Sequence, residues 1–217
     1  MDFLELFAKY APVFLQATWV TLALTAVALV FAGILGMGVA AMAMSRLAPL
    51  KWLASGFIGL IRGTPLIAQL FLLYFGLTSI VVLDKFWAGA IALGIHNSAY
   101  IAEIIRSGFQ AVPKGLVEAA RSLGMSRERT LRRVQAPLAF RTILPVLGSQ
   151  FIIAVKDSSL VGFIGLTELF RTAQNTAAAT YKPLSTYAIV SVYYLAIVLV
   201  LTAVVNRMEK RLGRHKS

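Results

Sequence analysis

Long stretches without a charged side chain constrain this chain more than any other feature of its sequence. Residues 10–45 contain no Asp, Glu, Lys or Arg, and similar runs follow at 63–83, 86–102 and 183–206. Each run is close to or longer than the ~20 apolar residues that a helix needs to cross a bilayer. A further run at 142–155 is interrupted by Lys156 and Asp157. The chain is therefore expected to be an integral membrane protein.

Composition supports this expectation, since 59% of residues are hydrophobic and 14% are charged, whereas soluble domains carry about a quarter charged residues. We expect one all-α domain over residues 1–217, with spans near 15–44, 54–80, 86–108, 141–165 and 184–206. Gly33, Gly36 and Gly38 indicate close helix packing in the first span. The absence of cysteine excludes disulfides, and the two histidines are too far apart to indicate a metal site.

The distribution of Lys and Arg gives an orientation. One set of alternate loops carries four of them: Lys9, Lys85, Arg171 and Lys182. The other set carries three from Arg46 to Arg62, eight from Arg106 to Arg141 and five from Arg207 to Lys216, sixteen in all. Because positive residues concentrate on the cytoplasmic side, we expect the N-terminus outside the cell and the C-terminus inside.

The cytoplasmic segment at about 109–140 has a pattern of its own. Pro113 is suited to open a helix that Gly115–Leu123 continue, and Gly124 is suited to end it in a left-handed cap. Ser126 can then cap a second helix, whose arginines would face lipid headgroup phosphates. The segment could also be a simple connection that satisfies the positive-inside bias.

A series of motifs along the chain resembles one family of membrane proteins. Glu118-Ala119-Ala120, then Gly124, then Leu144-Pro145 about twenty residues later, is similar to the cytoplasmic motif of permeases from binding-protein-dependent ATP-binding-cassette (ABC) importers. Seven further segments resemble the polar-amino-acid permeases, of the histidine, glutamine and arginine type: Arg62–Leu66, Gln69–Phe71, Tyr74–Leu77, Ser98–Glu103, Ala111–Gly115, Gln150–Ile152 and Lys156–Leu160. The resemblance therefore covers nearly the whole chain.

The resemblance implies a type I ABC importer permease fold with five transmembrane helices. It implies that Gly115–Leu123 is a coupling helix that docks on an ATPase, with Glu118, Ala119, Ala120 and Gly124 as coupling residues. The implied partners are cytoplasmic ATP-binding subunits, a second permease copy or close paralogue, and an extracytoplasmic amino-acid-binding protein. The chain has no Gly-x-x-x-x-Gly-Lys-Ser/Thr motif. We therefore expect ATP and Mg²⁺ on the partner, with no cofactor and no enzymatic activity in this chain.

Polar residues of the second, third and fourth expected spans are candidates for contact with the solute: Gln69, Asn97, Ser98, Tyr100, Glu103 and Asp157. Polar side chains at membrane depth are costly, and a zwitterionic amino acid needs both acceptors and donors. The acidic pair, Glu103 and Asp157, favours polar or basic amino acids. The alternatives are interhelical hydrogen bonds, a salt bridge from Glu103 to Arg106, and a structural break held by Lys156-Asp157.

The sequence thus predicts the permease subunit of an ATP-driven amino-acid importer in a bacterial inner membrane. The main alternative is an ion-coupled secondary transporter of small solutes that uses Lys156, Asp157 and Glu103. Such a transporter would need repeated halves with broken helices, and the sequence shows no such repeat. A membrane anchor for cytoplasmic proteins would explain the basic segment but not the buried polar groups.

Overall fold

The computed structural model describes residues 2–213, with side chains for residues 2–210. His215 and the last residues of the charge count, Arg214 and Lys216, lie outside that range. The described residues form helices and no strand: α1 (Phe3–Ala43), α2 (Ala48–Gly63), α3 (Leu66–Gly76), α4 (Lys85–Gln110), α5 (Lys114–Ser122), α6 (Arg127–Thr130), η1 (Leu131–Gln135), α7 (Ala136–Asp157), η2 (Ser158–Ile164), α8 (Leu169–Thr180) and α9 (Pro183–Gly213). The π-helical turn η1 joins α6 to α7, and η2 is a 3-10 segment.

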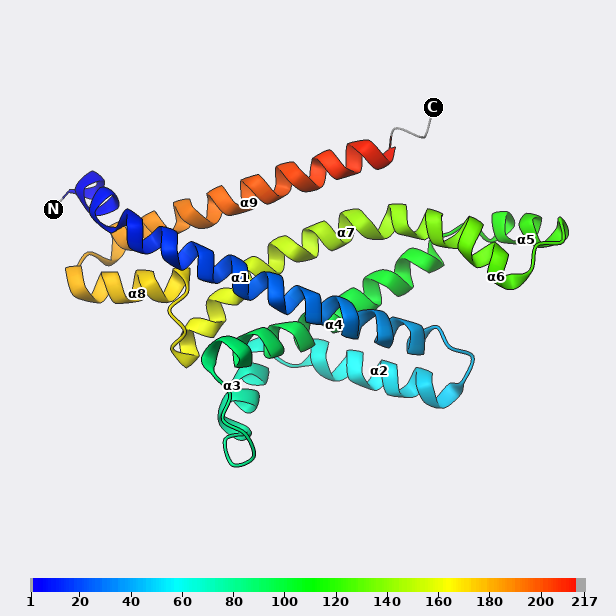
Figure 1. Cartoon of the computed structure of the whole chain (residues 1–217), viewed down its shortest axis with the longest axis horizontal. Helices are drawn as coiled ribbons and strands as arrows, with labels where there is room; N and C mark the ends of the chain where they lie inside the picture. The colour runs from blue at the N-terminus through cyan, green and yellow to red at the C-terminus, as the bar shows by residue number, and fades with distance from the viewer. Residues whose placement is uncertain (1, 214–217) are drawn as a thin grey trace.

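Four helical segments are long and apolar enough to cross a membrane: α1, α4, the continuous stretch Arg127–Ile164, and α9. A fifth span is present if α2 and α3 are counted together, because the two are bent by 101° at a short break. The all-helical, five-span expectation is therefore confirmed, with the second span broken rather than straight. In Figure 1, α5 and α6 extend beyond the C-terminal end of α9 at one end of the molecule.

The break between α2 and α3 corrects the single second span expected at 54–80. Thr64 adopts an extended conformation with φ −121° and ψ 146°. Pro65 has no N–H to continue the helix and disfavours helical geometry at the residue before it. The Gln69 side chain partly replaces the lost helix bonds, since its Nε2 donates to the carbonyl oxygen of Ile61 at 2.8 Å and to Thr64 Oγ1 at 2.7 Å.

Helix α1 begins twelve residues before the expected start at residue 15. Asp2 and Glu5 form a capping box at its N-terminus, which satisfies backbone N–H groups that have no partner in the helix. The side chains of Leu6 and Phe14 are fully buried and belong to an apolar cluster with residues of α8 and α9. Local capping and tertiary packing therefore extend the helix past the charge-free run.

Helices α1 and α4 pack closely through glycines on both sides. A methyl group on Gly36 would lie 2.9 Å from the carbonyl oxygen of Ser98, and one on Gly94 would lie 2.9 Å from Phe31 Cβ. Gly33 and Gly38 have no atom within 4 Å of such a methyl group. Of the three glycines singled out in the first span, close packing is therefore confirmed at Gly36 only. Small residues at such contacts let membrane helices approach closely, which strengthens their van der Waals packing.

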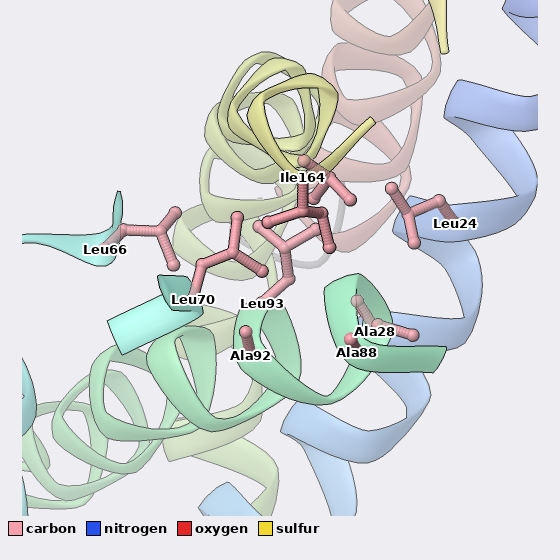
Figure 2. Packing of buried hydrophobic residues seen from close by; sticks show 10 residues of the cluster. Leu24, Ala28, Leu66, Leu70, Ala88, Ala92, Leu93 and Ile164 are labelled. Carbon is pink, nitrogen blue, oxygen red and sulfur yellow. The ribbon is translucent and has the colours of Figure 1, made fainter. Parts of the chain in front are cut away.

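A second packing centre joins α1, α3, α4 and η2. It consists of Leu24, Ala28, Leu66, Leu70, Ala88, Ala90, Ala92, Leu93, Val161 and Ile164. Figure 2 shows Leu70, Leu93 and Ile164 close together, with the alanines of α4 leaving room for the neighbouring helices. This centre fixes α3, the second half of the broken span, against α4.

Helix α8 was not expected from the sequence, because its residues are too polar for a span. Glu168 directly precedes α8 and caps its N-terminus. The Glu168 side chain is fully buried and accepts hydrogen bonds from the backbone N–H groups of Phe170 and Arg171 and from the Tyr194 hydroxyl. Burial raises the pKa of Glu168 to about 7, against the opposing effect of these hydrogen bonds. Glu168 therefore ties α8 to α9 through a carboxyl group that titrates near neutrality.

The two-helix pattern predicted after Pro113 is confirmed in its local details. Gly124 has φ +79°, a conformation that glycine adopts without strain. The N–H of Gly124 donates to the carbonyl of Arg121, and that of Met125 donates to Ala120, which is a Schellman cap. Ser126 Oγ accepts from the N–H of Arg129 at 3.3 Å. The second helix differs from expectation, because it runs through η1 into α7 without a break.

Candidate functional site

A cavity with several polar side chains on its wall lies between the second half of α4 and α7, beside the end of α2. Its volume is about 410 Å³. The polar side chains on its wall are Arg62, Tyr100, Glu103, Ser107, Thr142 and Gln150, and the remaining wall is Ile104, Gly108, Ala111 and Val146. The cavity therefore presents a guanidinium, a carboxylate, three hydroxyls and an amide from three helices.

Two residues named from the sequence, Tyr100 and Glu103, lie on this wall. Glu103 forms an ion pair with Arg106 one turn along α4, with a distance of 2.9 Å from Arg106 Nε to Glu103 Oε2. Both side chains are only partly exposed, at 28% and 32%. The salt bridge considered as an alternative role for Glu103 is therefore present, and it coexists with exposure of the carboxylate to the cavity.

The cavity connects to the helix break through a chain of side chains. The Arg62 guanidinium stacks 5.4 Å from the centre of the Tyr100 ring, a cation–π distance. The Tyr100 ring lies 5.2 Å from the ring of His96. His96 Nδ1 is 3.0 Å from Gln69 Oε1. Gln69 thus holds the α2–α3 break to α4 and does not line the cavity.

Asn97 and Ser98 are fully buried. Asn97 Oδ1 accepts from Gln150 Nε2 at 2.8 Å, and Asn97 Nδ2 donates to the carbonyl of Leu93. The Ser98 hydroxyl donates to the carbonyl of Ile95 at 2.6 Å. In this conformation neither side chain faces the cavity, so the interhelical hydrogen bond considered for this part of α4 is the one that Asn97 makes.

Asp157 lies at the C-terminal end of α7, where the helix passes into η2. It does not line the cavity. Because seven residues are almost two full turns, Asp157 falls on the same face of α7 as Gln150, roughly 10 Å further along the helix. Lys156 is exposed and Asp157 is half-buried, so adjacent charges of α7 differ in their surroundings.

The four residues predicted to couple to an ATPase have different surroundings on α5. Glu118 and Ala119 are exposed, whereas Ala120 is only 6% exposed because it packs within the chain. Ala120 therefore has almost no side-chain surface available to a partner in this conformation. Gly124 contributes the cap that ends the helix.

Four polar wall residues were not named as site residues from the sequence: Arg62, Ser107, Thr142 and Gln150. Gln150 is the single amide side chain in the charge-free run 142–155, and an amide in such a run is a signal that could have found it. Arg62 is the second-last residue of the apolar helix α2, directly before the break. Within residues 2–210 no group of His, Cys, Asp or Glu is arranged to hold a metal ion.

Comparison with known protein families matches residues 32–214 to binding-protein-dependent transport system inner membrane components. The chain is 35% identical over 203 residues to the arginine transport system permease protein ArtQ of Bacillus subtilis (strain 168), covering 93% of each protein. It is 42% identical over 159 residues to the glutamine transport system permease protein GlnP of Escherichia coli (strain K12), covering 72% of this chain and 73% of GlnP.

Two solved structures resemble the fold. One, described as an amino acid ABC transporter with histidines, has a TM-score of 0.92 and 42% identity and covers 97% of this chain and 99% of its own. The other, the methionine ABC transporter MetNI in an inward-facing conformation, has a TM-score of 0.78 at 21% identity and covers 92% of this chain and 96% of its own. The second likeness concerns the fold alone.

Proposed function

Because the chain belongs to the family of binding-protein-dependent transport system inner membrane components, we propose that it is the transmembrane permease subunit of an ATP-driven importer of amino acids. The observation that carries the proposal is the match, at 42% identity over 97% of the chain, to an amino acid ABC transporter. The relatives ArtQ and GlnP are named for arginine and glutamine transport. None of these relatives favours the ion-coupled secondary transporter.

The family description supports a bacterial inner-membrane location and a separate solute-binding protein. Two cytoplasmic ATP-binding subunits would carry ATP and Mg²⁺, and the permease would pair with a second copy or a close paralogue. The charge count supports an N-terminus outside the cell and a C-terminus inside. In this orientation the cavity opens toward the cytoplasmic end of the spans, and α5 lies beyond it on the cytoplasmic side.

The cavity supports recognition of a zwitterion. Arg62 would bind a carboxylate and Glu103 an ammonium group, with Tyr100 and Gln150 as further polar contacts. Asp157, on the same face of α7, would contact the solute nearer the outer side. An acidic pair still favours polar or basic amino acids.

Gln69, Asn97 and Ser98 would position the cavity rather than contact the solute. Their side-chain hydrogen bonds go to neighbouring helices or to their own helix. The exposed residues Glu118 and Ala119 would face the ATPase, and Gly124 would hold α5 in the required direction.

The proposal is tested by amino-acid uptake into vesicles that contain the permease, its ATP-binding subunits and its binding protein. Uptake should require hydrolysable ATP and persist after the proton and sodium gradients are collapsed. In the same vesicles, Glu103→Gln should raise the solute concentration for half-maximal stimulation of ATP hydrolysis by about tenfold or more, since a hydrogen bond to a charged group is lost. Glu209→Gln, which removes an exposed carboxylate, is the matched control.

Loss of uptake on addition of an uncoupler, with ATP still high, would contradict an ATP-driven mechanism. An unchanged solute dependence in Glu103→Gln would remove Glu103 from the solute site and leave the transport class intact.

A further inference from the structure

An arginine-lined groove lies on the helix that follows the Gly124 turn. It has a volume of about 320 Å³ and is lined by Ser126, Glu128, Arg129, Arg132 and Arg133. Arg132 is paired with Glu128 at 2.8 Å, and both side chains are largely exposed, at 77% and 70%. No ion pair within residues 2–210 engages Arg129 or Arg133. The groove is therefore a cationic surface with two guanidinium groups free to bind an anion.

The position of this groove relative to the membrane can be judged from the packing of α7 against α9. A methyl group on Gly148 of α7 would lie 2.6 Å from Val205 Cγ2 of α9, so the two residues are at the same level. Val205 is two residues before Arg207, where the apolar run of α9 ends. Arg133 lies fifteen residues before Gly148, which is about 22 Å of helix.

On a helix that crosses the bilayer without strong tilt, lipid headgroups would not reach that far. The headgroup region adds only about 5–8 Å to each side of the hydrocarbon core. Figure 1 agrees, because α5 and α6 extend beyond the end of α9 along the length of the molecule. For a helix that runs close to the membrane normal, this geometry favours an aqueous location for the groove over the expected contact of its arginines with lipid phosphates.

The groove also adjoins the proposed docking helix. Helix α5 packs against α6 and η1, so a protein docked on α5 would lie next to Arg129 and Arg133. We propose that this groove binds a carboxylate-bearing surface segment of the ATP-binding subunit, as a second contact beside α5. The inference rests on the proposed function, because it requires an ATP-binding partner. The cationic lining requires an anionic occupant, and the distance from the bilayer together with continuity with α5 selects a protein carboxylate over a lipid phosphate.

The test is the affinity of the purified permease for its ATP-binding subunit in neutral detergent without added lipid, at low and high salt. Arg129→Gln/Arg133→Gln should weaken binding about tenfold at low salt and reduce its salt dependence. Arg129→Lys/Arg133→Lys, which keeps the charge, should retain most of the affinity. Arg46→Gln/Lys51→Gln removes two exposed charges elsewhere on the same side and should change binding less than twofold.

The outcomes separate the possible occupants. Unchanged affinity in the glutamine pair would overturn the proposal. An effect that appears only in vesicles with anionic phospholipid would assign the groove to lipid and also overturn it. At saturating ATP-binding subunit, the glutamine pair should still show solute-stimulated hydrolysis, because α5 is intact. Failure of the wild-type permease to bind the subunit at all would instead overturn the proposed function.

Discussion

Stability of the permease should fall as pH rises through neutrality because of Glu168. Its side chain is fully buried, and burial raises its pKa from an ordinary 4.5 to about 7. The folded chain therefore keeps a proton that the unfolded chain releases between these values. The stabilising effect of that proton is complete below pH 4.5 and is lost as pH rises through 7.

The magnitude follows from the two pKa values. The difference between about 7 and 4.5 corresponds to about 3 kcal/mol of unfolding free energy. Most of this change in unfolding free energy should occur between pH 5 and pH 8.5. For a chain of this length the corresponding change in melting temperature is roughly 5–10 °C.

The assay is thermal unfolding of the purified permease in detergent at pH 5 and pH 8.5. Glu168→Gln cannot ionise, so its melting temperature should depend less on pH than that of the wild type by the amount given above. Comparing the two proteins removes the contribution of every other titrating group. Glu209→Gln, at an exposed carboxylate, should keep the wild-type dependence. Equal pH dependence in wild type and Glu168→Gln would refute the argument that Glu168 is protonated in the folded chain near neutrality.

Two further predictions concern coupling and orientation. Gly124→Val places a β-branched residue at φ +79°, so it should reduce transport and association with the ATP-binding subunit while the protein still reaches the membrane. Gly56→Val, at an exposed glycine of α2 with open space around it, is the matched control, and normal coupling in Gly124→Val would show that the cap does not matter. Val82→Cys, in the exposed α3–α4 connection, should react with an impermeant thiol reagent from outside intact cells, and Ser122→Cys should not. The reverse pattern would overturn the orientation, and the chain has no native cysteine to interfere.

The features that depend on residues close together in the sequence were predicted best. The α5 helix, its left-handed Gly124 end and the Ser126 cap were all foreseen, because capping chemistry acts over four or five residues. The spans were foreseen from hydropathy, which reports the length of an apolar segment but not whether the helix changes direction within it. The break before Pro65 was missed for that reason, although a proline within an apolar run was the available signal.

Features that depend on contacts between distant segments were predicted less well. Tyr100 and Glu103 are three residues apart on one helix, so their shared face could be inferred. Arg62 and Gln150 reach the same cavity from other helices, and nothing local indicates that meeting. Glu168 was missed for a similar reason, since its burial depends on α9.

The unbroken path from α6 through η1 to α7 has a mechanical consequence. Residues 127–157 form one helical rod, about 46 Å long at 1.5 Å per residue. One end adjoins the proposed docking helix, the middle forms a wall of the cavity, and the other end carries Asp157. Pivoted at one end, such a rod would move its other end by about 8 Å for a 10° tilt. A lever of this kind would carry a movement of the proposed docking helix to the proposed solute cavity without a relay of side chains.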